Sequence, residues 1–439
     1  MVRRTFSPVV VASGHRIVPL WVLWTLLTVF FLSGCATRPY AGKELISAGF
    51  LARAQTQQQG TFRVTAAAPD AAETKALTGL DLYEQGIQPI WLEVENTGSS
   101  SARLALRSID KDYFSPIEVA YMNRKKFSSQ GYRDMERWFY DNRLQRRIPA
   151  GESRSGLVFT NYRKGTKGFN LDIFRNQQAT SFTFFLPIPG FTADYTRVDF
   201  SSLYTAQEIR ELDEQGLKTL LEQELPCCAK DETGQLDAGP LNSVLVGTPL
   251  AVRRSLLRGG WLETEVANSM TQLARGHRFL GRTPDAVFYV DRVDGNERLQ
   301  LNLWMAPWRV HNEAVWLGQV FYRYKDKPLA MALREKSDVL RQSDLIASII
   351  GESVSADIDS AQRFLVQNFW YNHSVLKVGL VGGVGVRSQE NPGVTSDGFV
   401  YFTLGQRAVL FLSEEAVAMD QGRIIYTGHK QLLGVMSNE

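Results

Sequence analysis

Residues 90–98 read IWLEVENTG, and this segment sets the expectation for the first half of the chain. Ile90, Leu92 and Val94 alternate with more polar neighbours before Asn96-Thr97-Gly98 supplies a turn. An apolar residue at every second position is typical of a strand with one buried face. Further short strands are expected at residues 103–107, 156–160 and 181–186. Together they predict a β-sandwich over residues 61–200.

This region also resembles a known type of module. The phrase WLEVENTGS at residues 91–99, followed by IPAGES at residues 148–153, is similar to immunoglobulin-like modules of bacterial envelope proteins. The resemblance implies an immunoglobulin-like sandwich.

The composition is that of a folded globular protein. The chain has 439 residues, of which 44% are hydrophobic and 22% charged, and this length favours two or three domains. Lys and Arg number 49 against 46 Asp and Glu, so no strong bias toward polyanions exists and nucleic acid is not expected as a partner. Three cysteines exclude a disulfide scaffold and a four-cysteine zinc site, and five histidines leave little room for histidine-based chemistry.

The N-terminus predicts the cellular compartment. Arg3, Arg4 and Arg16 precede the apolar run 17–32, which ends in Leu32-Ser33-Gly34-Cys35. A basic region, an apolar region and small residues before a cleavage point are typical of a secretory signal peptide, here residues 1–34. The L-S-G-C sequence resembles the bacterial lipobox, which implies that Cys35 carries fatty acyl chains such as palmitate. The alternative is an uncleaved signal anchor.

Residue 36 bears on the choice of membrane. It is Ala, and by resemblance to proteobacterial lipoproteins a residue other than Asp at this place permits export to the outer membrane. The expected location is therefore the outer membrane, facing the periplasm, with the inner membrane as the alternative. The lipid bilayer is then a partner through the acylated N-terminus, and envelope proteins or anionic lipids are further candidates.

Two connecting segments are expected. Residues 35–60 are polar and rich in Gln, and they predict a tether. Residues 201–236 predict a linker helix and a turn: Thr205-Ala206-Gln207-Glu208 fits a capping box, and leucines on one face follow up to Leu225.

Within the sandwich region, residues 121–147 are unusually basic. They hold eight basic residues against three acidic ones, with six aromatic residues interleaved. The patch candidates for an anionic ligand are Arg124, Lys125, Lys126, Arg133 and Arg137. Arginine forks there could bind lipid phosphates. The alternative, which the pattern favours, is an inserted helix whose aromatic side chains pack on the sandwich while its basic face is solvated.

Cys227 and Cys228 are the thiols that remain once Cys35 is acylated. In an oxidising periplasm they are disulfide candidates, and the bond would fix a turn. Free thiols, a disulfide between two chains and a metal site are the alternatives, although two adjacent sulfurs without nearby histidines make a poor metal site.

The second half predicts alternating strands and helices. Strands are expected at residues 241–246, 287–293, 298–305 and 313–324, with helices at 250–257 and 358–369. In the strand 298–305, Leu299, Leu301 and Leu303 should face the core while Gln300 and Asn302 face outward. The whole chain is thus expected to be an α+β multidomain protein.

Several pieces of this half occur in a specific order. They are GPLNSVLVG at 239–247, LRGGW at 257–261, FLGRTPDAVF at 279–288, LW at 303–304, VWLG at 315–318 and DID at 357–359. Together they resemble the LssY-like C-terminal domain, which we assign to residues 237–376, followed by a C-terminal β extension at 377–439. The family is associated with membrane-bound phosphatases and other lipid-linked modules.

This chain departs from the family pattern where histidines are expected. The family tends to show paired histidines at the positions of Leu299 and Gln300, an arginine at that of Asn302, and further histidines near Glu352 and Ser353. If those histidines served a metal or a proton relay, this copy lacks them.

Motifs for catalysis are missing from the sequence. No G-x-S-x-G, H-E-x-x-H, Walker A or G-x-G-x-x-G motif occurs, so no catalytic residue, metal or cofactor is predicted. His311, close in sequence to Trp304, Trp308 and Trp316, is expected to be structural. We therefore expect a membrane-anchored periplasmic lipoprotein with a non-catalytic binding or scaffolding role. The alternative is an accessory hydrolase that acts on lipid-linked phosphate esters.

Overall fold

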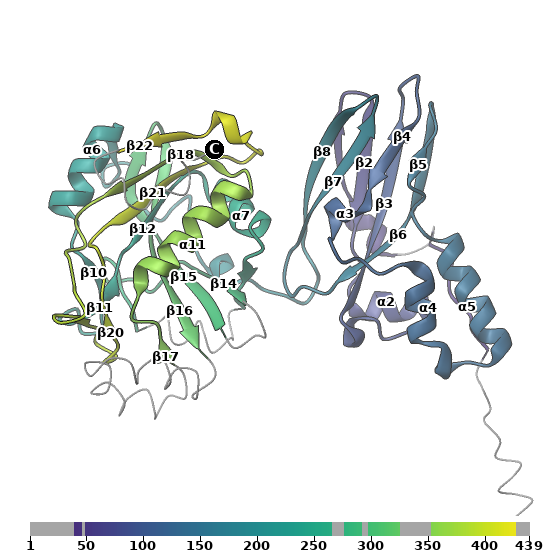
Figure 1. The fold of residues 1–439 in the computed structure, drawn as a ribbon, viewed down its shortest axis with the longest axis horizontal. Coiled ribbons are helices and arrows are strands. Elements are labelled where there is room, and N and C mark those ends of the chain that lie inside the picture. Colours follow the sequence, from purple (N-terminus) through teal and green to yellow (C-terminus); the bar gives the residue numbers. More distant parts are fainter. Residues whose placement is uncertain (1–38, 46–48, 266–275, 292–296, 325–352, 427–439) are drawn as a thin grey trace, which may run out of the picture.

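The computed structural model describes residues 39–45, 49–265, 276–291, 297–324 and 353–426. They form two bodies of mixed α+β structure with mainly antiparallel sheets (Figure 1). The predicted α+β class is therefore confirmed. The predicted signal peptide and the acylation candidate Cys35 lie outside the described residues.

The first body is a sandwich of two four-stranded antiparallel sheets. One sheet has the order β1-β2-β3-β6, formed by Gln55–Gln59, Phe62–Ala67, Ile87–Asn96 and Glu152–Asn161. The other has the order β5-β4-β7-β8, formed by Arg147–Ile148, Ala102–Ala105, Lys167–Arg175 and Gln178–Leu186. Ile90, Leu92 and Val94 are fully buried between the sheets, as their spacing predicted.

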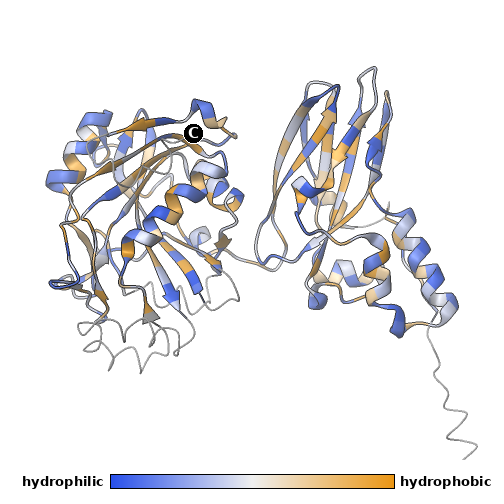
Figure 2. Ribbon diagram, viewed as in Figure 1, coloured by the Kyte–Doolittle hydropathy of each residue, from blue (hydrophilic) through white to orange (hydrophobic). Residues whose placement is uncertain are grey.

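Helices cover the outer face of the β1-β2-β3-β6 sheet. They are η1 (Gly49–Arg53), α2 (Ala71–Thr78), η2 (Tyr83–Gln85), α4 (Pro116–Met122), η3 (Arg124–Lys126) and α5 (Ser129–Asp141), whereas the single turn α3 (Leu106–Ile109) packs on the sandwich core. Helix α5 begins at Ser128, whose side chain accepts a hydrogen bond from the Gly131 amide. Its Met135 and Phe139 are buried, while the rest of the helix is largely hydrophilic (Figure 2).

The prediction of a tether as far as residue 60 is wrong. Residues 55–59 form the edge strand β1, and the amides of Gln55 and Gln57 donate to carbonyls of Phe185 and Thr183 on β8 at 3.0 and 2.6 Å. The glutamine side chains therefore connect the edge strands β1 and β8 of the two sheets by hydrogen bonds. The polarity of these glutamines predicted a solvated linker. Their actual hydrogen-bond partners are carbonyls on the edge of a distant strand, which the local sequence does not identify.

The chain is already fixed at the start of the described residues. Tyr40 is buried, with its ring 5.4 Å from that of Phe127, and Trp138 Nε1 donates to the Lys43 carbonyl at 3.1 Å. Gly42 passes directly over the Trp138 ring, where a Cβ atom would lie 2.5 Å from Nε1. Only glycine fits this close approach.

The second body is built on a large mixed sheet. Its path is β13-β14-β15-β16-β12-β21-β18-β22, with β17 paired to β16 and β9 to β15. In that order the strands are Leu262–Glu263, Ala286–Asp291, Glu297–Val310, Glu313–Tyr324, Ser243–Val246, Arg407–Leu412, Val375–Val381 and Arg423–Ile425, with Ser353–Val354 and Arg210–Leu212 at the sides. The β16 bounds and the approximate places of β12, β14 and β15 agree with the prediction.

Helices lie on both faces of this sheet. Helices α7 (Pro249–Arg258) and α11 (Ile358–Tyr371), both expected from the sequence, pack on one face. On the other face lie α6 (Glu214–Thr219), the π-helical turn η5 (Leu220–Glu224) and two small hairpins, β10–β11 (Cys228–Lys230 and Asp237–Pro240) and β19–β20 (Gly393–Val394 and Val400–Tyr401). The body is therefore three-layered.

Two predicted boundaries in this half are wrong. The C-terminal β extension predicted for residues 377–439 is not a separate unit as far as residue 426, where the described residues end, because β21 lies in the middle of the sheet between β12 and β18. The predicted linker helix does not begin at Thr205: Glu208 does bond back to the Thr205 amide at 2.8 Å, but within a turn. Strand β9 follows, and its pairing with β15 overrides the local helical preference.

The two bodies meet at a buried carboxylate. Glu263 accepts a hydrogen bond from the Thr166 amide of the first body at 2.8 Å and from Arg253 Nε of α7 at 3.0 Å. The hydroxyl of Tyr195, in the connecting segment, donates to the same carboxylate. One side chain therefore ties both bodies and the segment between them together.

The connecting segment carries a second buried acid, in the turn η4 (Asp194–Arg197). Asp194 is fully buried, and its Oδ2 accepts from the Val287 amide at 2.9 Å while its Oδ1 has no partner. Burial is the main cause that raises the pKa of Asp194 to about 7. The folded protein therefore favours the neutral carboxyl.

This burial predicts a pH-dependent stability. Because the folded pKa lies above the unfolded value near 3.8, the stabilising protonated form is lost as pH rises from about 4 to about 7. Asp194→Asn should remove this loss, so the variant's free energy of unfolding relative to wild type should rise by about 3 kcal/mol between pH 4.5 and 7.5. Urea unfolding at several pH values measures the difference.

The matched control is Asp199→Asn. Asp199 is exposed, and hydroxyl donation from Ser201 and Ser202 lowers its pKa, so its contribution should be constant above pH 4.5. Equal pH profiles for the two variants would contradict the assignment to Asp194.

Candidate functional site

Three amide side chains are buried on the face of the second sheet opposite α7 and α11. Gln300, Asn302 and Gln319 are 1%, 0% and 4% exposed. The prediction that Gln300 and Asn302 face outward is therefore wrong. The alternation of the strand is correct, but the hairpins β10–β11 and β19–β20 cover this face instead of solvent.

The amides form a continuous hydrogen-bond chain with a guanidinium. Arg323 Nη1 donates to Gln300 Oε1 at 2.8 Å, and Gln300 Nε2 donates to Asn302 Oδ1 at 2.8 Å. Asn302 Nδ2 donates to Gln319 Oε1 at 3.0 Å, and Gln319 Nε2 donates to the Ala238 carbonyl at 3.1 Å. Because a guanidinium can only donate, Arg323 fixes the direction of every amide in the chain.

A histidine joins the chain at Gln319. His277 Nδ1 lies 2.7 Å from Gln319 Oε1, which the chain orients as an acceptor, and Nε2 lies 3.0 Å from Asp397 Oδ2. Both ring nitrogens therefore face oxygen atoms of the protein and are engaged within it.

A cavity of about 120 Å³ lies against this chain. Its other walls are mainly apolar and aromatic, with Phe321, Phe399 and Tyr401 among them. Burial is the main cause that lowers the pKa of Arg323, to about 10, so this guanidinium remains cationic at neutral pH. The cavity therefore combines a cation and amide donors on one side with aromatic surface on the other.

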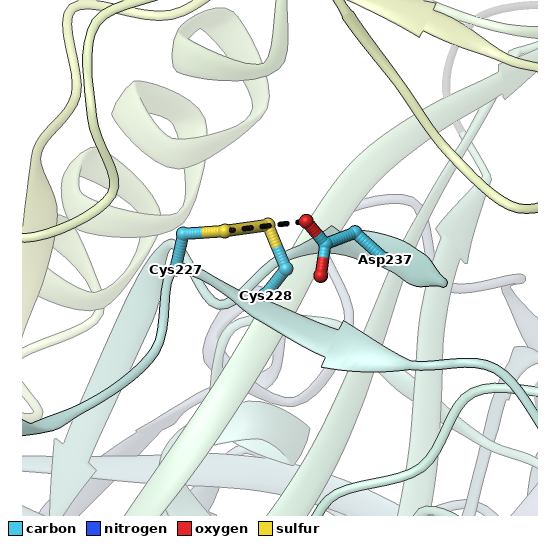
Figure 3. Close-up of side chains that lie close together, drawn as sticks. All are labelled: Cys227, Cys228 and Asp237. Carbon is cyan, nitrogen blue, oxygen red and sulfur yellow. Dashed lines mark hydrogen bonds between the residues drawn. A yellow bond between two sulfur atoms is a disulfide. The ribbon is translucent and has the colours of Figure 1, made fainter. Parts of the chain in front are cut away.

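The adjacent cysteines lie behind one wall of the cavity. Cys227 and Cys228 are joined by a disulfide, and a carboxylate oxygen of Asp237 lies 3.9 Å from the Cys227 sulfur (Figure 3). The Cys228 sulfur lies 3.8 Å from the hydroxyl of the cavity residue Tyr401. The disulfide is thus in contact with the cavity wall.

This cysteine cluster is also where metal donor atoms converge, since the two sulfurs and an Asp237 oxygen lie within 4.8 Å of one another. The sulfurs are bonded to each other, however, and Lys230 Nζ pairs with the carboxylate at 2.7 Å. Disulfide sulfurs are not thiolate ligands, so this arrangement does not fit a metal ion.

A buried arginine holds the turn that carries the cysteines. Arg407 is 0% exposed and donates to the carbonyls of Leu241 at 3.0 Å, Pro226 at 2.7 Å and Leu225 at 3.3 Å, and also to that of Leu221. Burial lowers its pKa to about 10. The carbonyls at the end of η5 form the negative end of a helical dipole. They therefore stabilise the positive charge of Arg407, which pairs with carbonyls rather than with a carboxylate in the described residues.

The sequence-predicted basic patch lies elsewhere. Arg124, Lys125 and Lys126 form η3, and Arg133 and Arg137 are exposed on α5, all in the first body. The packing of Phe139 and Met135 under this surface agrees with the inserted-helix interpretation. The structure does not bring these cations to the cavity.

Other sequence candidates have structural places. His311 is exposed in the β15–β16 turn and lies 3.5 Å from Glu214. Asp357, in the DID piece, caps α11, whereas Asp359 is buried and accepts from the Thr403 hydroxyl and the Leu404 amide. His277, which sequence reasoning left without a role, is the histidine that reaches the cavity.

Comparison with known proteins returned no match, either among family models or among curated proteins. Of the helices that the structure describes, none has both the length and the apolar character needed to span a bilayer.

The burial of Arg407 gives a prediction for stability. Arg407→Met should lower the free energy of unfolding of the second body by about 3 kcal/mol or more, because several buried carbonyls would lose their donor at about 1–3 kcal/mol each. Urea unfolding followed by tryptophan fluorescence measures the loss. The control Arg423→Met, at an exposed position on β22, should change it by less than about 0.5 kcal/mol. A loss below 1 kcal/mol for Arg407→Met would contradict the assigned role.

Proposed function

We propose that this protein is a lipid-anchored envelope protein whose second body binds a small molecule without transforming it. The observation that carries the proposal is the buried, directional chain from Arg323 to His277 beside a cavity of about 120 Å³. Buried polar groups need partners, and a chain satisfied in this way is a rigid recognition surface.

The anchor is supported by sequence. The basic and apolar segments before Leu32-Ser33-Gly34-Cys35 are typical of an acylated lipoprotein, and Ala36 favours the outer membrane with the body in the periplasm. The inner membrane remains the alternative. The disulfide of Cys227 and Cys228 suits an oxidising compartment.

The residues of the cavity define the class of ligand. Arg323 is a cation, and the amide groups of Gln300 and Asn302 each have a second N–H beyond the bond that holds the chain. The wall thus offers donors, while Phe321 and Phe399 offer apolar surface. The fitting ligand carries an anionic or strongly accepting group and a small apolar part.

Two finer family assignments belong to the same proposal. The immunoglobulin-like character of the sandwich and the LssY-like character of residues 237–376 rest on the sequence pieces that carry them. Support comes from position, because the pieces at 239–247 and 315–318 lie on β11, β12 and β16, beside Gln319 and the cavity.

The binding function can be tested by native mass spectrometry of protein purified from envelopes. Wild type should retain a small bound molecule, and Asn302→Leu should lose it, because this near-isosteric change interrupts the chain between Gln300 and Gln319. Gln367→Leu, at a half-buried position of α11, is the matched control and should retain the molecule. The absence of any bound species in wild type, or equal retention by all three proteins, would contradict the proposal.

An accessory phosphohydrolase is the second candidate. The observation in its favour is that His277, Asp397 and Arg323 line one cavity. Against it, both nitrogens of His277 are already engaged.

The hydrolase candidate predicts phosphate release. We expect none above background from phosphatidic acid with wild type, and the same result with His277→Ala. Release by wild type that is abolished in His277→Ala would replace the binding proposal with the hydrolase.

A further inference from the structure

One surface of the first body combines exposed apolar and basic side chains. We call it the α4–α5 face and define it as the exposed residues of α4, η3 and α5. On α4, Ile117, Tyr121 and Met122 are 50%, 54% and 45% exposed, although they are large and apolar. Ile117 and Tyr121 are four residues apart and therefore lie on the same side of the helix, and Met122 follows Tyr121 at the helix end. This is a cluster rather than scattered single residues.

The same face carries a concentration of positive charge. Arg124, Lys125 and Lys126 follow α4 directly, and Arg133 and Arg137 form an exposed stripe on α5. The Arg124 guanidinium lies over the Tyr121 ring, 3.7 Å from its centroid, so the aromatic and basic groups are interleaved.

Acidic neighbours are partly engaged in local contacts. Glu118 closes the capping box of α4 by accepting from the Ser115 amide, and Asp134 accepts from the Gln130 side chain at 2.9 Å. Glu136 and Asp141 also lie on α5, so α4, η3 and α5 hold five basic against four acidic residues, and the basic charge is concentrated at Arg124, Lys125 and Lys126.

The chain enters the fold beside this face. Tyr40 packs on Phe127, the residue that follows Lys126, and its ring also lies 6.2 Å from that of Trp138 on α5. Tyr40 is five residue steps from Cys35, and five steps span at most about 18 Å. An acyl anchor at Cys35 therefore keeps Tyr40, which packs beside the α4–α5 face, within about 18 Å of the attachment point.

From these observations we infer that the α4–α5 face lies on an anionic phospholipid bilayer. The inference rests on the proposed lipid anchor and adds the surface that meets the membrane. Ile117, Tyr121 and Met122 enter the interface, and Arg124, Lys125 and Lys126 bind lipid phosphates while their stems cover apolar surface. The anchor then sets the orientation of the body as well as its location.

Photo-cross-linking of the acylated full chain tests the orientation. The photoreactive residue p-benzoylphenylalanine replaces Tyr121 in one variant and Phe174 in the other, in vesicles of phosphatidylethanolamine and phosphatidylglycerol. Phe174 is a matched control because it is 47% exposed and precedes Arg175, which bonds to Thr61 at the β1–β2 turn, remote from α4. Position 121 should give lipid adducts by mass spectrometry, and position 174 should not.

Vesicle co-sedimentation tests the charges without the anchor. The chain 35–439 with Cys35→Ser keeps every described residue and should bind phosphatidylglycerol vesicles more strongly than phosphatidylcholine vesicles, with salt weakening the binding. The triple variant R124E/K125E/K126E should lower the partition coefficient roughly tenfold or more. The control R63E/R103E/R107E, at exposed arginines outside α4, η3 and α5, should lower it less than about twofold.

The outcomes separate the face from the anchor. A lack of lipid adducts at position 121 in protein whose Cys35 is shown to be acylated overturns the inference and leaves the anchor standing. Adducts to a protein instead of lipid overturn it as well and assign the face to that partner. If Cys35 proves bare, the proposed anchor fails, and co-sedimentation alone decides: equal losses for the two triple variants, or no preference for anionic vesicles, overturn the inference.

Discussion

The second body depends on one buried cation. Arg407 lies on the central strand β21, and its guanidinium donates to carbonyls at the end of η5, to that of Pro226 before the cysteines, and to that of Leu241 between β11 and β12. One side chain of the sheet therefore brings two separate stretches of the chain to a single point. Because each carbonyl would be costly to bury without a donor, the arginine fixes the path of the chain from the π-helical turn to β11. That path is one wall of the cavity.

In the proposed arrangement, the first body is a spacer between the bilayer and the cavity. Its N-terminal segment is clamped by Trp138 on α5, and its far side is tied to the second body through Thr166 and Glu263. The first of these hydrogen bonds is exposed and the second is buried, and together they hold the cavity of the second body at a defined distance from the point where the chain enters the fold. Such an arrangement suits the proposed role, in which a binding site is presented at a fixed place rather than on a free tether.

Local pattern predicted much of the fold and little of the site. The alternation around Ile90 and the run at Glu313–Tyr324 gave strands because their buried faces are long and regular. The edge strand at Gln55–Gln59 was missed, since its stabilising partners are carbonyls more than a hundred residues away. The alternation of residues placed Gln300 and Asn302 on the correct face of β15. That alternation carries no information about the hairpins that cover this face. The comparison with the family pattern did mark those two positions as unusual, and it was the better signal.

The parallel pairing of β12 with β21 has a consequence for biogenesis. Residues 243–246 receive their neighbour on one side only when residues 408–411 have emerged, so the second body closes late and through contacts of very high sequence separation. The strands of the sandwich end at Leu186, so the first body can form before the residues of the second body have emerged. In the proposed export from the N-terminus, the first body is therefore free to fold before the second, and the unfinished second body would be exposed to chaperones and proteases until residues 408–411 arrive.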